Sequence, residues 1–257
     1  MNTSLLIPFF AVLLISVVFS MFGKGGGSLY TPVLVMLGWA DKTVIPTSLF
    51  LNLVTAFVAM VVFVRNKLVD FKFSSIFLPG TIVGSLLGAL LSSRAPMNLL
   101  LGIFSAFLAF VGAIMIFSGK GETKQQPAES RSKGWRAVMV VVLFSFGVGV
   151  LSSLIGVGGG LIIFPFLVLY VGYNAQKAAG ANAYIVTVSS IVGSLGHMAV
   201  GHLNYLLLGV TTVAVAIGSA IGSHVTVKAS PKFVKVAFGC ILWFFSVEIA
   251  LHLLGVL

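Results

Sequence analysis

The stretch GKGGGSLYTP (residues 23–32) returns later in the chain as GVGGGLIIFP (residues 156–165), with Val157 in the place of Lys24. Each copy sets four glycines into apolar sequence and follows the last of them, five residues on, with a proline. The two copies indicate an internal duplication. They also single out Lys24 as the one charge that the second copy lacks.

The composition identifies the class of protein in which these motifs occur. Of the 257 residues, 59% are hydrophobic and 8% are charged, whereas roughly a quarter of the residues of a soluble domain are charged. The apolar residues form runs of about 17 to 25, the length that a helix needs to cross a bilayer core of ~30 Å. The sequence therefore predicts an all-α, polytopic integral membrane protein.

Ten apolar segments can be drawn along the chain. A polar stretch at residues 118–136, which contains Pro127 and the densest group of charged residues, predicts a solvated linker between a first transmembrane repeat (1–117) and a second (137–257). The segments are residues 5–22, 28–37, 45–64, 73–92 and 97–117 in the first half, and 137–155, 161–171, 178–200, 206–227 and 236–254 in the second.

A shift of 133 or 134 positions superimposes the halves well beyond the glycine motifs. It lays Gly38 on Gly172, and the pair Gly84 and Gly88 on Gly218 and Gly222. Because each half contains an odd number of segments, the two repeats should run in opposite senses through the membrane. Inverted repeats are an architecture of secondary transporters with alternating access. A channel and a membrane scaffold remain the alternatives.

The basic residues predict the orientation of the chain. Loops rich in Lys and Arg stay in the cytoplasm, so the linker and the loop after residue 64 are predicted inside, and both termini outside the inner membrane. In this topology Lys42 and Arg94 are the only basic residues outside. The net charge of +10 thus reflects the orientation of the chain in the membrane. The basic residues lie in short loops, an arrangement that does not indicate nucleic-acid binding.

The segments that follow the glycines, 28–37 and 161–171, are too short to cross the membrane, since about ten residues of helix extend only ~16 Å. We therefore expect a hairpin or a broken helix at each GxGGG motif, with irregular backbone buried in protein or lining a wet cavity. Helix N-termini with free N–H groups bind anions. The predicted substrate contacts are Gly25, Gly26, Gly27 and Ser28 in the first copy and Gly158, Gly159 and Gly160 in the second.

Other motif residues are predicted to be structural. Pro32 and Pro165 should kink or end the short helices. Gly84 with Gly88, and Gly218 with Gly222, have the small-xxx-small spacing that lets transmembrane helices pack closely.

The whole chain resembles the sulfite exporter TauE/SafE family of membrane transporters. The resemblance rests on the two glycine motifs, on Thr47-Ser48-Leu49, on the loop Leu68-Val69-Asp70-Phe71 and on the glycine pairs. Lys24 departs from the family pattern, in which a small or apolar residue is usual. The resemblance implies transport, as an exporter or an importer, of small sulfur-containing anions such as sulfite or organosulfonates, driven by an ion gradient. A non-sulfur carboxylate is the alternative substrate.

Several polar side chains within the spans are candidates for the substrate site. Lys24 either faces the substrate as a cation or extends its stem toward the headgroups. Hydroxyl and amide groups can orient an oxyanion or bond between helices, and Asn182 is the strongest of them because it aligns with Ser48. These candidates are Thr47, Ser48, Asn52, Asn182 and Tyr184.

Glu248 and His252 lie one helical turn apart in the last span and could carry coupling protons, or could lie at the outer interface or a subunit contact of a homodimer. No group of His, Cys, Asp or Glu has metal-ligand spacing, and no nucleophile has a histidine and a carboxylate beside it. The sequence therefore predicts neither an enzyme nor a bound cofactor.

Overall fold

The computed structural model describes residues 5–39, 44–91, 97–117, 135–155, 159–198 and 205–253, and these residues form helices and short connections without a strand. The first half contains α1 (Leu6–Ser20), α2 (Gly27–Met36), α3 (Val44–Arg65), α4 (Phe71–Ser74), α5 (Phe77–Leu91) and α6 (Met97–Phe117). The second contains α8 (Trp135–Ile155), α9 (Gly160–Phe166), the π-helix η2 (Leu167–Val171), α10 (Ala175–Met198), α11 (Tyr205–Lys228) and α12 (Pro231–Leu253). The all-α prediction is confirmed.

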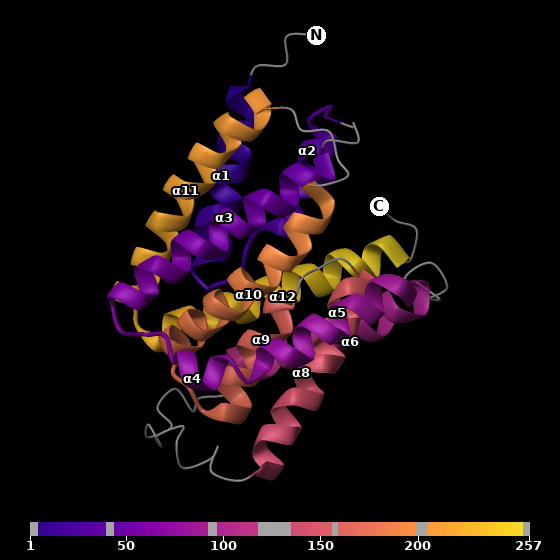
Figure 1. The fold of residues 1–257 in the computed structure, drawn as a ribbon, viewed down its shortest axis with the longest axis vertical. Coiled ribbons are helices and arrows are strands. Elements are labelled where there is room, and N and C mark those ends of the chain that lie inside the picture. Colours follow the sequence, from indigo (N-terminus) through magenta and orange to yellow (C-terminus); the bar gives the residue numbers. More distant parts are fainter. Residues whose placement is uncertain are drawn as a thin grey trace.

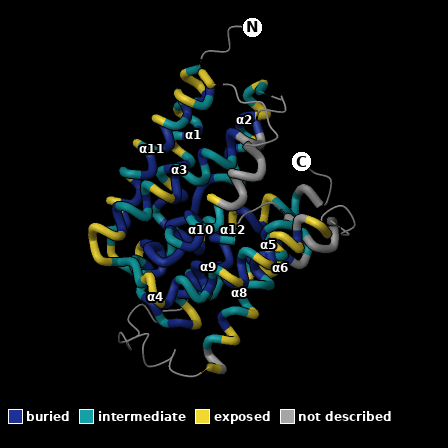
Figure 2. Tube along the Cα trace, viewed as in Figure 1, coloured by how far each residue is buried: buried dark blue, intermediate teal, exposed yellow. Residues whose placement is uncertain are grey.

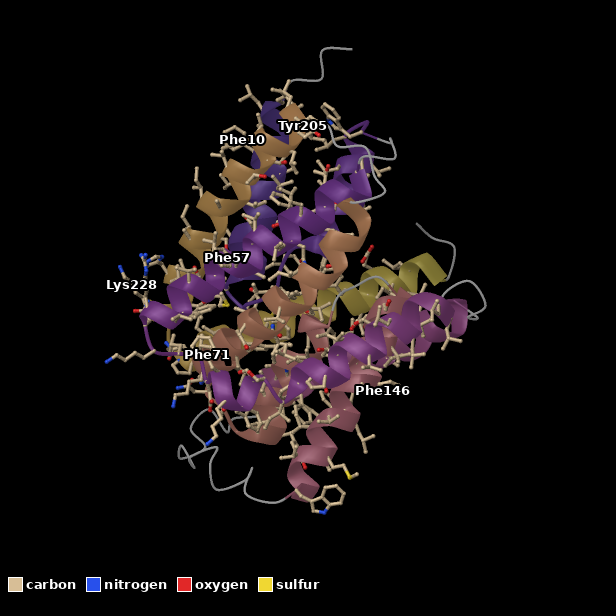
Figure 3. All side chains as sticks on the ribbon, in the orientation of Figure 1. Phe10, Phe57, Phe71, Phe146, Tyr205 and Lys228 are labelled. Atoms are coloured by element: carbon tan, nitrogen blue, oxygen red, sulfur yellow. The ribbon has the colours of Figure 1, made fainter. Side chains whose placement is uncertain are left out.

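Within the described residues, four helical stretches are long and apolar enough to cross a bilayer: Thr47–Arg65, Phe71–Gly88, Tyr205–Lys228 and Pro231–Leu251. Shorter apolar helices accompany them, including α1 and α2. Large apolar side chains point outward over the bundle, among them Phe10 (59% exposed), Phe57 (50%) and Tyr205 (80%), all labelled in Figure 3. Such a surface suits lipid, and the molecule is a polytopic membrane protein.

Capping residues and glycines set several helix boundaries. Asp70 Oδ1 accepts the Phe73 N–H at 3.0 Å before α4, and Ser230 Oγ accepts the Phe233 N–H at 3.2 Å before α12, which begins with Pro231. Gly172 ends η2 with φ +81°, a left-handed conformation that glycine adopts without steric cost. The apolar segment 73–92 begins inside α4, and a turn at residues 75–76 separates α4 from α5.

The helices of the two halves are interleaved. The most extensive contacts join α5 to α8, α6 to α12, α1 to α11, and α3 to α10. Figure 1 shows α1 and α11 side by side at the upper left, and α5, α6 and α8 grouped at the lower right. Buried residues concentrate where α9, α10 and α12 meet (Figure 2). There Phe22, from the break after α1, packs edge-on against Phe164 of α9 and Phe238 of α12, with ring centroids 5.8 and 4.8 Å apart.

The paired glycines lie in the closest helix contacts. A Cβ atom at Gly84 would overlap the Phe146 carbonyl oxygen of α8, and one at Gly88 would lie at 2.5 Å from that of Val150. On α11, Gly218 and Gly222 approach the backbone of α1 in the same way. These four glycines thus have the packing positions that their spacing predicts.

We expect Gly222→Ala to destabilise the protein by about 1–3 kcal/mol, because the added methyl group would overlap the Val17 carbonyl oxygen of α1. Gly209→Ala, on the same helix, is the matched control, since a Cβ atom there meets nothing within 4 Å. Alanine favours helix over glycine by ~1 kcal/mol, so the control should be neutral or stabilising. Thermal unfolding of the two purified variants in detergent measures this difference in stability. Equal effects of the two substitutions would contradict the packing assignment.

Basic side chains gather at one end of the bundle. Their nitrogen atoms cluster at the left of Figure 3, around Lys228 and Phe71. At this end Gln176 Nε2 donates to the carbonyls of Thr226 and Ala229 at 3.2 and 2.8 Å, which ties the start of α10 to the end of α11. The residues predicted to face the cytoplasm after α3 and α11 therefore share one side of the molecule. Lys42, Arg94 and linker residues 118–134 lie outside the described residues.

Another contact at the same end joins the two halves. The hydroxyl of Tyr173, in the loop before α10, donates to Asp70 Oδ2 at 2.9 Å. Burial raises the pKa of the Tyr173 phenol above its ordinary value, and the hydrogen bond to Asp70 and its charge raise it further. Tyr173 therefore remains a donor to Asp70 at neutral pH.

Candidate functional site

The helix of the first segment breaks at the glycine motif. α1 ends at Ser20 and α2 begins at Gly27, and the residues between them fold back in a turn in which the Lys24 N–H donates to the Phe19 carbonyl at 3.1 Å. Gly23 has φ +64° and lies against α10, where a Cβ atom would overlap the Ala179 carbonyl oxygen. Only glycine fits both the backbone conformation and the space. The motif therefore fixes a sharp break against α10.

This break turns Lys24 into the protein interior. The side chain is 2% exposed, its Nζ donates to Ser28 Oγ at 2.9 Å, and it lies 4.7 Å from the ring centroid of Phe19 and 5.5 Å from that of Phe245. Ring faces attract a cation but do not neutralise it. The alternative that Lys24 extends to the headgroups is wrong for this conformation, because a snorkelling side chain keeps its ammonium group in water.

No carboxylate among the described residues is paired with Lys24. Asp70 binds Tyr173 at the basic end, and Glu248 is exposed on α12. A buried charge without a counter-charge costs several kcal/mol. The ammonium group of Lys24 therefore favours an anion at this position.

The N-terminus of α2 is not free to bind an anion through every N–H. The Gly27 N–H donates to Asn52 Oδ1 at 2.9 Å, and Asn52 Nδ2 donates to Ser190 Oγ of α10 at 2.8 Å. Gly25 lies so close to Asn52 that a Cβ atom would overlap its side-chain oxygen. In this conformation Asn52 holds α2 to α3 and α10, so the expectation that Gly27 and Asn52 offer donors to a substrate needs correction.

The second motif meets the first at Asn182. Asn182 Nδ2 donates to the carbonyls of Phe22, at 2.9 Å, and of Gly160, at 3.2 Å. A Cβ atom at Gly160 would come to 3.0 Å from Lys24 Cγ and 3.2 Å from Asn182 Nδ2. Lys24, Gly160 and Asn182 therefore form one buried cluster in which the two glycine motifs touch.

The other predicted site residues lie as follows. Thr47 and Ser48 are buried on α3. Gly26 is the N-cap residue of α2, and Gly159 that of α9. Tyr184 lies away from the Lys24 cluster, with its hydroxyl 3.1 Å from Ser75 Oγ and its ring edge-on to Phe71. Gly158 and the side chain of His252 lie outside the described residues.

The sequence predicted that the prolines kink or end the short helices, and neither proline ends its helix. Pro32 lies inside α2, which continues to Met36, and Pro165 lies inside α9, which passes into the π-helix η2 at Leu167. The wider turn of η2 directly after Pro165 is a local irregularity of the kind that a missing N–H donor favours.

Three contacts of the site were not foreseen from the sequence. Phe19 and Phe245 line the Lys24 ammonium group, and Ser190 binds Asn52. The sequence contains 22 phenylalanines, and no pattern distinguishes these two from the others. Ser190 lies two turns after Asn182 on α10. This helical spacing is the one feature of the sequence that could have predicted a place for Ser190 near the site.

Comparison with known proteins gives a consistent result. The family model for the sulfite exporter TauE/SafE matches residues 8–249. The Bacillus subtilis protein YunE, named a probable membrane transporter protein, is 27% identical over 87% of this chain and 89% of its own length. A Methanocaldococcus jannaschii protein of the same description, MJ0441, is 24% identical over 93% of both chains. No solved structure matches the chain.

Proposed function

The chain belongs to the sulfite exporter TauE/SafE family, and on that premise we propose that it is a secondary transporter that exports small sulfur-containing anions. The observation that carries the proposal is the buried ammonium group of Lys24, which has no described carboxylate partner and lies where the two glycine motifs meet. A sulfonate or sulfite group would supply the missing negative charge and accept hydrogen bonds from Nζ.

The proposed transport cycle is alternating access by two inverted repeats. The packing of helices from one half on helices of the other supports this cycle. α1 packs on α11, and α8 packs on α5. The sequence shift that superimposes the halves lays the first of these pairs on the second. Lys24, Ser48 and Asn182 are each at most 2% exposed. A substrate would reach them only when the halves move apart, which favours a carrier over an open channel.

The proposed topology keeps both termini outside the inner membrane and the basic end in the cytoplasm, as the positive-inside rule requires. The coupling ion and a homodimer are further parts of the proposal. Glu248, exposed on α12, would serve either in proton coupling or at a subunit contact, because a carboxylate facing lipid is unfavourable.

A panel of anions tests the proposal. We expect sulfite, thiosulfate or a sulfonate to raise the unfolding temperature of the purified protein, since a ligand at about 100 times its Kd stabilises by ~2.7 kcal/mol. Carboxylates of equal charge are the control. Efflux from proteoliposomes should saturate with concentration, as a carrier requires. Stabilisation by carboxylates alone, or flux that rises linearly without saturation, would contradict the proposal.

A further inference from the structure

The side-chain amide of Asn182 can be oriented in only one way. Its Nδ2 donates to two backbone carbonyls, those of Phe22 in the first motif region and of Gly160 in the second. If the amide were turned over, Oδ1 would face two carbonyl oxygens, which accept hydrogen bonds and cannot donate them. Both donors of the amide are therefore used within the protein. Asn182 can offer a ligand only an acceptor.

This acceptor is unsatisfied. Asn182 is 0% exposed, and its Oδ1 has no hydrogen-bond partner among the residues that the structure describes. A buried acceptor without a donor costs about 1–3 kcal/mol, so native proteins keep few such atoms, and each needs an explanation.

Ser48, which occupies the equivalent position in the first half, repeats the pattern. Its side chain is 1% exposed, and its Oγ also has no partner in the described part of the chain. Serine hydroxyls in helices commonly bond to a carbonyl one turn back, as Thr55 does to Leu51 at 2.7 Å. Ser48 and Asn182 thus each leave a buried oxygen without a described donor, at corresponding positions of α3 and α10.

We infer that the transported anion carries its own O–H or N–H group, which donates to Asn182 Oδ1 while its negatively charged group binds Lys24. The inference rests on the proposed function and narrows its substrate class. Hydrogen sulfite and hydroxyalkanesulfonates have such a donor. Sulfate, thiosulfate and simple alkanesulfonates do not, and their oxygen lone pairs would face the amide oxygen.

A matched pair of ligands tests this inference. 2-Hydroxyethanesulfonate and ethanesulfonate have the same charge and differ by one hydroxyl group. We expect the wild-type protein to bind the hydroxylated anion about ten-fold more tightly, the effect of one satisfied hydrogen bond in a buried site. Titration calorimetry or ligand-dependent thermal unfolding measures the ratio of the two Kd values.

Two variants assign the preference to its source. In Asn182→Ala the ratio should fall to about one. Thr211→Val should keep the ratio, since the described hydrogen bonds of the Thr211 hydroxyl stay within α11, to Leu207 and Leu208. Should Asn182→Ala fail to fold, the ratio of the two Kd values in the wild-type protein still tests the inference.

Each remaining outcome has a distinct meaning. Equal Kd values in the wild type, a preference that persists in Asn182→Ala, or no binding of either sulfonate would overturn the inference and leave the proposed function standing on the other anions. Failure of every anion in the panel would overturn the proposed function itself.

Discussion

Lys24→Met is expected to abolish stabilisation by sulfur-containing anions and, in the absence of ligand, to raise the unfolding temperature. Methionine keeps the length and apolar stem of lysine but removes the charge, and hydrogen bonds to charged groups contribute about 1.5–3 kcal/mol. Anion affinity should therefore fall roughly 10- to 150-fold. The ligand-free protein should gain stability, because a buried ammonium group without a carboxylate is costly and methionine fits beside the rings of Phe19 and Phe245.

Lys228→Met is the matched control for this substitution. Lys228 is exposed at the end of α11, so its loss removes the same charge from the molecule without changing the buried cluster. The control should retain the anion response of the wild type. If Lys24→Met binds anions as tightly as Lys228→Met does, Lys24 is not the counter-charge of the substrate. If Lys24→Met instead strongly lowers the unfolding temperature of the ligand-free protein, the role of the ammonium group is to stabilise the fold.

Gly23→Ala is expected to have the largest effect on folding. Alanine at φ +64° costs about 1–2 kcal/mol, and its methyl group would overlap the Ala179 carbonyl oxygen and come to 2.7 Å from the Ala183 nitrogen. These are backbone atoms of α10, which cannot swing aside as a flexible side chain can. Together the two effects should cost roughly 2–5 kcal/mol. The variant should therefore give little monodisperse protein on size-exclusion chromatography, and no transport.

Gly147→Ala provides the comparison. Gly147 lies in α8, and a Cβ atom there meets nothing within 4 Å, so this substitution should leave yield and transport unchanged or slightly improve stability. Normal folding of Gly23→Ala would show that the break does not depend on the close approach to α10.

The helices were predictable because the thickness of the bilayer core sets the length of an apolar helix that crosses it. The segment predicted at 97–117 coincides with α6, and the short segment predicted at 28–37 differs by one residue at each end from α2. Uninterrupted apolar sequence has no other stable solution in lipid than a helix. The break at the first motif, between α1 and α2, was predictable for the same reason, since the segment after the glycines is too short to span.

The site was predicted less completely, because its hydrogen bonds join residues distant in the chain. Asn182 was singled out by its alignment with Ser48, but as a donor to oxyanions; its donors are in fact used by Phe22 and Gly160. Tyr184 has a similar position in sequence and yet lies against Ser75. Local spacing places a residue on a helix face, but it does not identify the groups that face it.

The sequence by itself determined the class of protein, the helical spans and the break at the first glycine motif, because these depend on hydrophobicity, length and glycine content. Only the tertiary structure decided that Lys24 turns inward over Phe19 and Phe245, that Asn52 holds the Gly27 N–H, and that Asn182 has an acceptor with no partner among the described residues. Each of these outcomes depends on which groups the folded chain brings into contact. Some of those contacts join helices more than a hundred residues apart in the chain.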